Sequence, residues 1–306
     1  MTEQLPEHPP LPAAAIEAYN LFIHGELSRR AFLGRLRQLA VGGLAAASML
    51  EALMPNYALA QQVSPQDDRL SAHAESVPSP QGNGSIGGYL VRPRSADTRA
   101  ATPARLPGIL VIHENRGLNP YIKDVARRLA LENFMAFAPD GLTSLGGYPG
   151  DDYRGGQLFM KVDRQKMFED FVAAAQWLKA RPDCSGRIGA IGFCYGGSVV
   201  NQLAVRLGDE LAAGVPFYGA PPPSADIARI RAAILVHQGA LDQRLAPTWP
   251  GYDAALSAAH LPHAGYVYPD AVHGFFCDAT PERYNRAAAE LAWTRTLAWF
   301  NQYLRG

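Results

Sequence analysis

Short apolar runs alternate with longer amphipathic stretches over most of the chain. Residues 107–113 and 135–138 are continuous apolar runs, as expected of strands that are buried on both faces of a sheet. Between them, residues 121–133 carry apolar side chains at the spacing of an amphipathic helix. The alternation continues with predicted strands at 188–191, 233–239 and 265–268 and predicted helices at 163–180, 198–207 and 283–303. This order predicts an α/β fold, with a mostly parallel sheet that helices cover on both faces.

The pattern divides the chain into three parts. Residues 85–306 show no break in composition, so we expect a single catalytic domain there, which begins with an antiparallel strand at 85–93. Residues 61–84 are polar and rich in Ser, Pro, Gln and Gly, as in a linker. Within the domain, the glycine-containing residues 142–162 are predicted to form a long loop over the functional site.

The first 60 residues resemble an export signal. Residues 28–33, SRRAFL, are similar to a bacterial twin-arginine motif, and residues 58–60, ALA, offer small side chains at the cleavage positions. One interpretation is therefore export to the periplasm by the twin-arginine route. The other is an N-terminal helical segment that stays attached and packs on the domain of a cytoplasmic protein. The apolar run at 39–50 is shorter than the roughly 20 residues of a membrane span, so we expect no stable membrane anchor.

Composition narrows the function classes. Lysine plus arginine and aspartate plus glutamate both number 28 in the 306 residues, so no net charge recruits nucleic acid. Three cysteines in a chain of this length do not form a disulfide framework. The hydrophobic content of 48% is typical of a globular protein with a sizeable core. The oligomeric state is left open.

The sequence GFCYGG at 192–197 marks the predicted centre of the site. It lies between a predicted strand and a predicted helix, which is the context of a nucleophile elbow with cysteine in place of serine. Such a turn is sharp, and Gly192 and Gly196 provide the missing side chains that it requires. The helix N-terminus would favour a thiolate at Cys194. A buried structural cysteine is the alternative.

An acid and a histidine follow the elbow in the chain order of an α/β-hydrolase. Asp242 comes after the predicted strand at 233–239, and His273 comes after the strand at 265–268. Open α/β sheets place their functional residues at these strand ends. We therefore predict a catalytic triad of Cys194, Asp242 and His273, with Asp140 as a less favoured acid.

Four ordered motifs resemble those of the dienelactone hydrolase family: HENRG at 113–117, GFCYGG at 192–197, GALD at 239–242 and AVHGF at 271–275. The resemblance covers roughly residues 80–304. It implies an α/β-hydrolase fold and a hydrolase that cleaves ester or lactone bonds of small molecules through a thiol ester intermediate. It implies no metal and no organic cofactor.

The resemblance also assigns residues around the sulfur. The family glutamate that matches Glu114 contacts the resting cysteine, and a neighbouring anion would hold the thiol neutral until substrate displaces it. The backbone N–H groups of Asn115 and Tyr195 are the expected oxyanion hole.

The substrate is less well specified. In the family an arginine four residues past the histidine helps bind a substrate carboxylate, but this chain has Cys277 there. Arg116, Arg154 and Arg283 are candidates to replace that cation, although each is more typical of a surface charge. Tyr148 and Phe275 are candidates for an apolar lining.

Two other function classes are compatible with the sequence. The fold could carry a binding or scaffold protein without catalysis, because fold does not dictate activity. Cys194 could instead serve thiol redox chemistry, although the chain has no C-x-x-C pair.

Overall fold

Eight strands form one sheet in the computed structural model, which describes residues 11–23, 25–40, 45–58, 60–94 and 105–306. Their order across the sheet is β1-β2-β4-β3-β5-β6-β7-β8. β1 pairs antiparallel with β2, and β2 pairs antiparallel with β4, whereas the six strands from β4 to β8 in this order are parallel to one another. The predicted, mostly parallel α/β sheet is therefore confirmed. The strands are β1 (Leu70–Ser79), β2 (Gly84–Pro93), β3 (Leu106–Ile112), β4 (Met135–Pro139), β5 (Cys184–Phe193), β6 (Ala213–Phe217), β7 (Ala233–Gly239) and β8 (His263–Tyr268).

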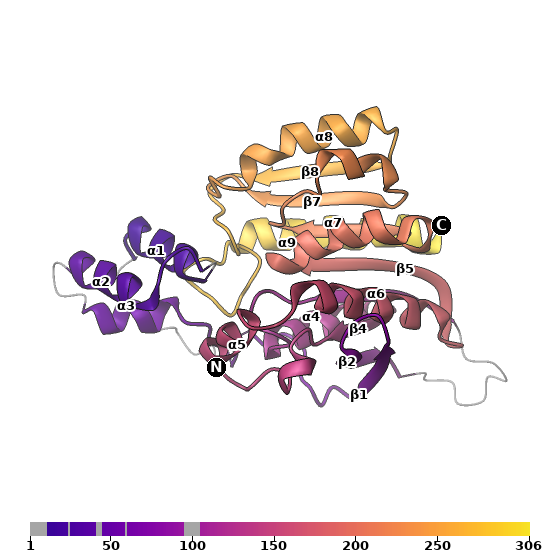
Figure 1. The fold of residues 1–306 in the computed structure, drawn as a ribbon, viewed down its shortest axis with the longest axis horizontal. Helices are drawn as coiled ribbons and strands as arrows, with labels where there is room; N and C mark the ends of the chain where they lie inside the picture. Colours follow the sequence, from indigo (N-terminus) through magenta and orange to yellow (C-terminus); the bar gives the residue numbers. More distant parts are fainter. Residues whose placement is uncertain (1–10, 24, 41–44, 59, 95–104) are drawn as a thin grey trace.

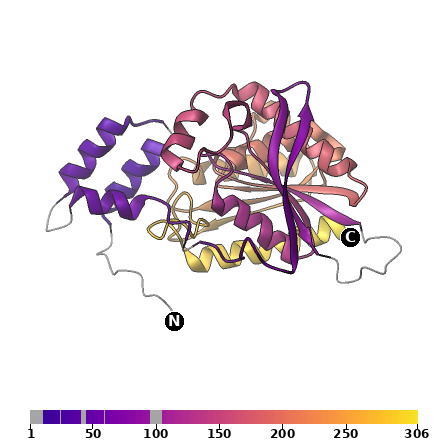
Figure 2. The same cartoon turned by 90° about the horizontal axis from the view of Figure 1, so that it is seen from below.

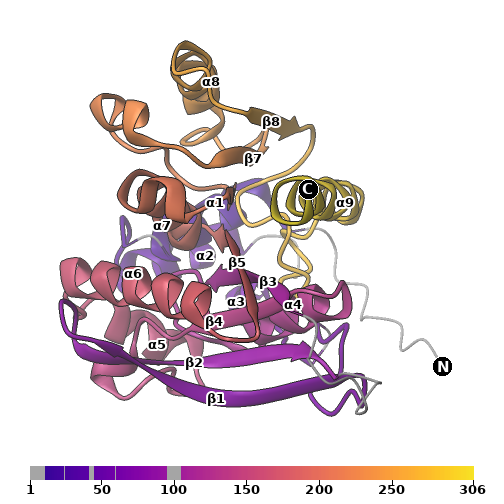
Figure 3. The ribbon, with the colours of Figure 1, turned by 90° about the vertical axis from the view of Figure 1, so that its right-hand side faces the viewer.

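Helices cover both faces of this sheet. Figure 3 shows α6, α7 and α8 on one face and α4 and α9 on the other. Each set buries its apolar stripe against the strands, which gives two hydrophobic cores separated by the sheet. The helices are α4 (Pro120–Leu131), α5 (Asp152–Phe159), α6 (Arg164–Ala180), α7 (Tyr195–Leu207), α8 (Trp249–Ala258) and α9 (Arg286–Arg305).

Two segments differ from their predicted conformation. The linker predicted at 61–84 contains β1, which pairs with β2 along its whole length. β1 is an edge strand with mostly exposed or half-buried side chains, so its sequence lacks the apolar alternation that marks a strand. The loop predicted at 142–162 contains a 3₁₀ turn (Thr143–Leu145) and helix α5, whose Gly155-Gly156 pair conceals its helical character in the sequence.

The N-terminal helical unit, residues 11–54, lies beside the domain. It consists of α1 (Ala13–Ile23), α2 (Arg29–Leu39) and α3 (Ala46–Leu53), which pack around a small core of their own. Figure 1 shows the unit at the end of the sheet to which the arrowheads of β7 and β8 point, and Figure 2 shows it projecting to the side. No helix within the described residues is long and apolar enough to cross a membrane.

The twin-arginine-like motif lies in this unit. Ser28 caps α2 by accepting a hydrogen bond from the backbone N–H of Ala31, and Arg29 and Arg30 begin the helix. Residues 1–10, 24, 41–44 and 59, which belong to the predicted signal, lie outside the described residues. Export therefore stays a prediction.

A buried ion cluster fixes the chain that leads from the helical unit into the sheet. The Asp124 carboxylate lies 3.2 Å from Nη2 of Arg127 and 2.5 Å from Nη2 of Arg128, and it accepts the backbone N–H of Val63. The two guanidinium groups in turn donate to the carbonyl oxygens of Val63 and Ala60. Ala60, the residue before the predicted cleavage point, is thus buried, and its carbonyl oxygen is bound by Arg128 of α4.

Replacing Asp124 should destabilise the fold strongly. Asp124→Ala leaves the buried Arg127 guanidinium without its carboxylate and takes one of two carboxylates from Arg128, which keeps Asp278 at 2.5 Å; the loss of a buried ion-pair partner costs about 3–5 kcal/mol in the free energy of unfolding. Asp226→Ala, which removes an exposed i,i+3 pair with Arg229, should cost less than about 1 kcal/mol. Urea unfolding of both variants measures the difference, and equal costs would contradict a structural role for the buried cluster.

Candidate active site

Cys194 lies at the sharp turn between β5 and α7. Its backbone has φ 54° and ψ −113°, a conformation that non-glycine residues rarely adopt. A β-carbon at position 192 would lie 2.2 Å from the carbonyl oxygen of Gly196, and one at 196 would lie 2.3 Å from that of Ile112. Both glycines of the predicted elbow are therefore required by backbone contacts, and the turn presents the sulfur at the start of a helix.

His273 and Asp242 come together although 31 residues separate them. Nδ1 of His273 lies 2.6 Å from Oδ2 of Asp242, and both side chains are buried. The other carboxylate oxygen, Oδ1, accepts the backbone N–H groups of Arg244 and Leu245, which orients the carboxylate. Asp140 instead accepts the backbone N–H groups of Leu118, Leu142 and Tyr148 and so organises a different loop.

Burial shapes the charge of this pair. Burial lowers the pKa of His273, and Asp242 opposes this only in part, so the imidazole favours its neutral form. Burial by itself would raise the pKa of Asp242, but the hydrogen bond and charge of His273 outweigh it, and the carboxyl has a pKa below its ordinary value. A neutral imidazole beside a carboxylate is the state that accepts a proton.

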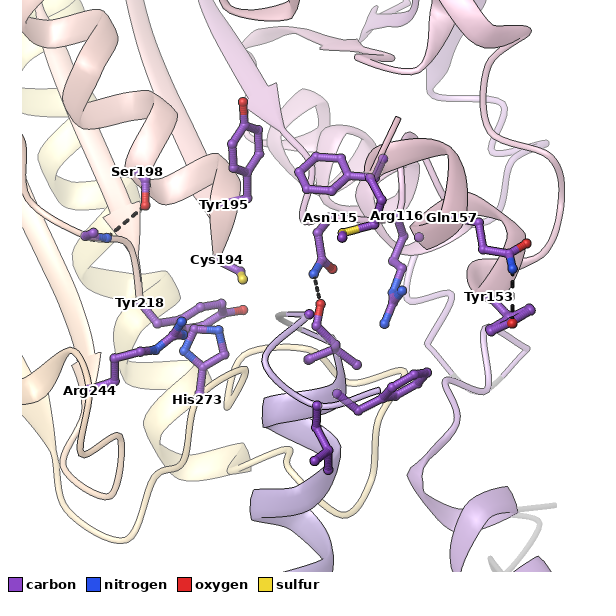
Figure 4. Close-up of a pocket in the computed structure, with 18 of the residues that line it drawn as sticks. Asn115, Arg116, Tyr153, Gln157, Cys194, Tyr195, Ser198, Tyr218, Arg244 and His273 are labelled. Carbon is purple, nitrogen blue, oxygen red and sulfur yellow. Dashed lines mark hydrogen bonds between the residues drawn. The ribbon is translucent and has the colours of Figure 1, made fainter. Parts of the chain in front are cut away.

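Cys194 and His273 line one pocket of about 500 Å³. Figure 4 shows the sulfur, the imidazole and the Tyr218 ring facing the same space. The Tyr218 and His273 rings are 4.9 Å apart between centroids, and Asp242 lies behind the imidazole, outside the pocket lining. The pocket volume of about 500 Å³ falls within the range of small-molecule sites.

The sulfur rests as a thiol. Burial and the nearby Glu114 raise the pKa of Cys194 to about 12, although the backbone N–H of Tyr195 favours the thiolate. The helix N-terminus favours the thiolate, as expected, but desolvation outweighs it because the side chain is only 7% exposed. Burial also raises the pKa of Glu114, which Arg283 and Arg116 oppose.

The structure brings some of the predicted residues to the pocket and leaves others away from it. Asn115, Tyr195 and Arg116 are in its lining. Tyr148 donates its hydroxyl to Asp152 at a distance of 2.8 Å, and Arg154 is exposed on α5. Phe275 is fully buried in the core. These three side chains do not line the pocket.

Among the residues that the structure describes, four arginines and no aspartate or glutamate line the pocket. Arg116 was predicted as a candidate; Arg29, Arg164 and Arg244 were not. A fifth arginine, Arg283, was a candidate whose more typical role is a surface charge; it is only 6% exposed and lines a smaller chamber with Glu114 and Cys194. The cation missing at position 277 is therefore available from other segments.

One local signal points to Arg116. A β-carbon at position 155 would lie 2.3 Å from the Arg116 carbonyl oxygen, and one at position 156 would lie 2.0 Å from its guanidinium. The two glycines of α5 thus make room for Arg116 to reach the pocket. The sequence contains no comparable pattern that would predict Arg29 or Arg244 as pocket residues, because neither lies within a family motif.

The remaining cysteines are not paired. Cys184, Cys194 and Cys277 are all buried, and none of the three forms a disulfide. Cys277 lies beside Glu114 and Arg283 in the smaller chamber, where burial raises the pKa of its thiol.

Removing the charge of Glu114 should make Cys194 more acidic. Glu114→Gln deletes an anion that favours the neutral thiol, so the pKa of Cys194 falls and its alkylation by iodoacetamide at pH 8 accelerates. The increase should be about tenfold for each pKa unit lost, reduced somewhat by the lower nucleophilicity of a less basic thiolate. Mass spectrometry of the Cys194 peptide gives the rate. Glu290→Gln, on the exposed face of α9, is the matched control, and an unchanged rate in Glu114→Gln would contradict the coupling.

Known proteins share this architecture. A solved structure of a proposed dienelactone hydrolase from Klebsiella pneumoniae is 29% identical and superposes with a TM-score of 0.65, covering 76% of this chain and all of that one. A dienelactone hydrolase-like promiscuous phosphotriesterase from metagenomic libraries is 26% identical with a TM-score of 0.64, covering 77% of this chain and 99% of that one. The predicted α/β-hydrolase fold is confirmed.

Sequence relatives agree. A proposed carboxymethylenebutenolidase from Escherichia coli O157:H7 is 33% identical over 257 residues, which are 79% of this chain and 90% of the relative. A proposed hydrolase fragment from Escherichia coli K12 is 48% identical over 120 residues, which are 39% of this chain and 97% of the fragment. The sequence model of the dienelactone hydrolase family matches residues 86–304. The chain therefore belongs to the dienelactone hydrolase family and is a hydrolase of that kind.

Proposed function

We propose that this hydrolase cleaves esters or lactones of small acids with Cys194 as the nucleophile, His273 as the proton carrier and Asp242 as the residue that orients it. The observation that carries the proposal is the geometry of the pocket. It contains a sulfur on a strained elbow and an imidazole whose Nδ1 is 2.6 Å from a buried carboxylate.

The proton balance follows from that geometry. Asp242 engages Nδ1, so Nε2 of His273 takes the thiol proton as the sulfur attacks the substrate carbonyl carbon. The carbonyl oxygen becomes an oxyanion, which the backbone N–H groups of Asn115 and Tyr195 stabilise. Collapse breaks the carbon–oxygen bond, and the departing alkoxide takes the proton from Nε2. Water, deprotonated by His273, then hydrolyses the thiol ester and restores the thiol.

Glu114 serves as a gate in this scheme. Its carboxylate disfavours the thiolate in the resting site, which protects the sulfur from oxidation. A substrate that displaces the carboxylate removes this penalty at the moment when the thiol must ionise. Arg283, in the same small chamber, offers the displaced carboxylate a cationic partner.

The arginines of the pocket favour a substrate that carries a carboxylate or another anionic group. A guanidinium binds a carboxylate through two parallel hydrogen bonds, which adds orientation as well as affinity. Arg116 is best placed for this role, because it lines both the main pocket and the small chamber beside the sulfur.

Replacing the nucleophile should abolish turnover. Cys194→Ala removes the covalent step, so nitrophenol release from nitrophenyl acetate should fall by at least about a thousandfold, since a missing triad member costs this much or more. Cys184→Ala, which removes a buried thiol outside the pocket, is the matched control and should keep wild-type rates. Equal rates in wild type and Cys194→Ala, with intact circular dichroism, would refute Cys194 as nucleophile.

Replacing Arg116 should separate anionic from neutral substrates. In Arg116→Met, KM for the nitrophenyl monoester of succinate should rise about tenfold or more, because a hydrogen bond to a charged group is lost. KM for nitrophenyl butyrate, which is neutral, should change by less than about twofold. Arg154→Met, on the exposed face of α5, controls for the loss of a positive charge. Equal effects on both substrates would contradict recognition of an anion.

A further inference from the structure

The N-terminal helical unit supplies part of the active-site wall. Among the described residues, six that line the main pocket come from it: Phe22, Ile23, Gly25, Leu27, Ser28 and Arg29. Ile23 also lines the small chamber that contains the sulfur, together with Tyr19 of the same unit. The family match begins at residue 86, so these side chains are an addition to the family's own domain.

The N-terminal helical unit contacts two different loops of the domain beside the main pocket. The amide of Asn115 donates a hydrogen bond to the carbonyl oxygen of Ile23 at the end of α1, a contact that Figure 4 shows as a dashed line. Glu26 lies 3.5 Å from the Arg244 guanidinium, two residues past Asp242. The unit thus holds the loop that follows β3 and the loop that follows β7, which carry the predicted oxyanion residue and the predicted acid.

Ring contacts add two further anchors. The Arg29 guanidinium lies 4.6 Å from the ring centroid of Tyr153 on α5, and the Arg283 guanidinium lies 5.1 Å from that of Tyr19 on α1. All four anchors lie next to the pocket, so the position of the helical unit is tied to the site itself.

Phe22 is the bulkiest apolar side chain that the unit contributes to the pocket. Its ring stacks on that of Phe32 at 4.8 Å with an interplanar angle of 5°, and Phe32 is buried in the unit's own core. Ile23 and Leu27, which follow Phe22 in the sequence, also line the pocket. A side chain held in this way sets a fixed boundary, because its ring cannot turn aside without disturbing that core.

We propose that the N-terminal helical unit is a specificity wall of the active site and that Phe22 limits the length of the apolar group that a substrate can place beside Cys194. The choice of esters as probes rests on the hydrolysis proposed above, whereas access to the thiol does not. The site of this chain is therefore completed by a segment that precedes the family domain.

Two substitutions of Phe22 in the full chain test the wall in opposite directions. Each methylene group that gains an apolar contact contributes on the order of fourfold in binding. The ratio of kcat/KM for nitrophenyl hexanoate to that for nitrophenyl acetate should rise about tenfold in Phe22→Ala and fall about tenfold in Phe22→Trp. Leu39→Ala is the matched control, because Leu39 packs in the same helical core but does not line the pocket.

A second measurement needs no turnover. Alkylation of Cys194 by a bulky pyrenyl maleimide, divided by its alkylation by iodoacetamide, should rise several-fold in Phe22→Ala, fall in Phe22→Trp and stay unchanged in Leu39→Ala. Mass spectrometry separates Cys194 from the other two cysteines. If wild type hydrolyses neither ester, the proposed function fails and these labelling ratios still decide the inference. Ratios that are equal in all four proteins, or a change in Leu39→Ala as large as that in Phe22→Ala, would overturn it.

Discussion

The close approach of backbone segments around Cys194 is the constraint on which the site depends. A β-carbon at Gly196 would meet the end of β3, and one at Gly197 would lie 2.6 Å from the carbonyl oxygen of Phe217 at the end of β6. The start of α7 is therefore pressed against the carboxyl ends of two neighbouring strands. This contact fixes the strained conformation of Cys194 and brings the loop after β3, with Glu114 and Asn115, next to the sulfur.

The charges of the site follow from this compact arrangement. Burial favours neutral forms of both the thiol and the imidazole, so the resting pair is uncharged and the proton has not yet moved. Around this neutral pair the structure places arginines from distant segments, in a chain whose total formal charge is zero. The field that a substrate meets is thus a property of the pocket and not of the molecule as a whole.

The N-terminal helical unit contributes residues to the pocket of the family domain. It has its own small core, and it contacts the domain at the rim of the pocket and through the buried Asp124 cluster that follows it. Arg29, which belongs to the twin-arginine-like motif, is also a pocket residue. The same short sequence is thus compatible with two roles: a signal for export and a part of the pocket lining.

The sequence by itself determined the features that depend on short-range chemistry. Gly192 and Gly196 identify the elbow because a turn of that shape excludes side chains, and the apolar runs identify the buried parallel strands because both of their faces are covered. The order of Cys194, Asp242 and His273 reflects the order of strands whose carboxyl ends meet. Tertiary structure alone decided the rest. The edge strand β1 is stabilised by pairing with β2 more than by its own pattern, the Arg283 guanidinium contacts Tyr19 of α1, and Phe22 lines the same pocket as a sulfur that lies more than 170 residues further along the chain. Such contacts join segments that are far apart in sequence, and no local pattern records which distant surface a side chain will meet.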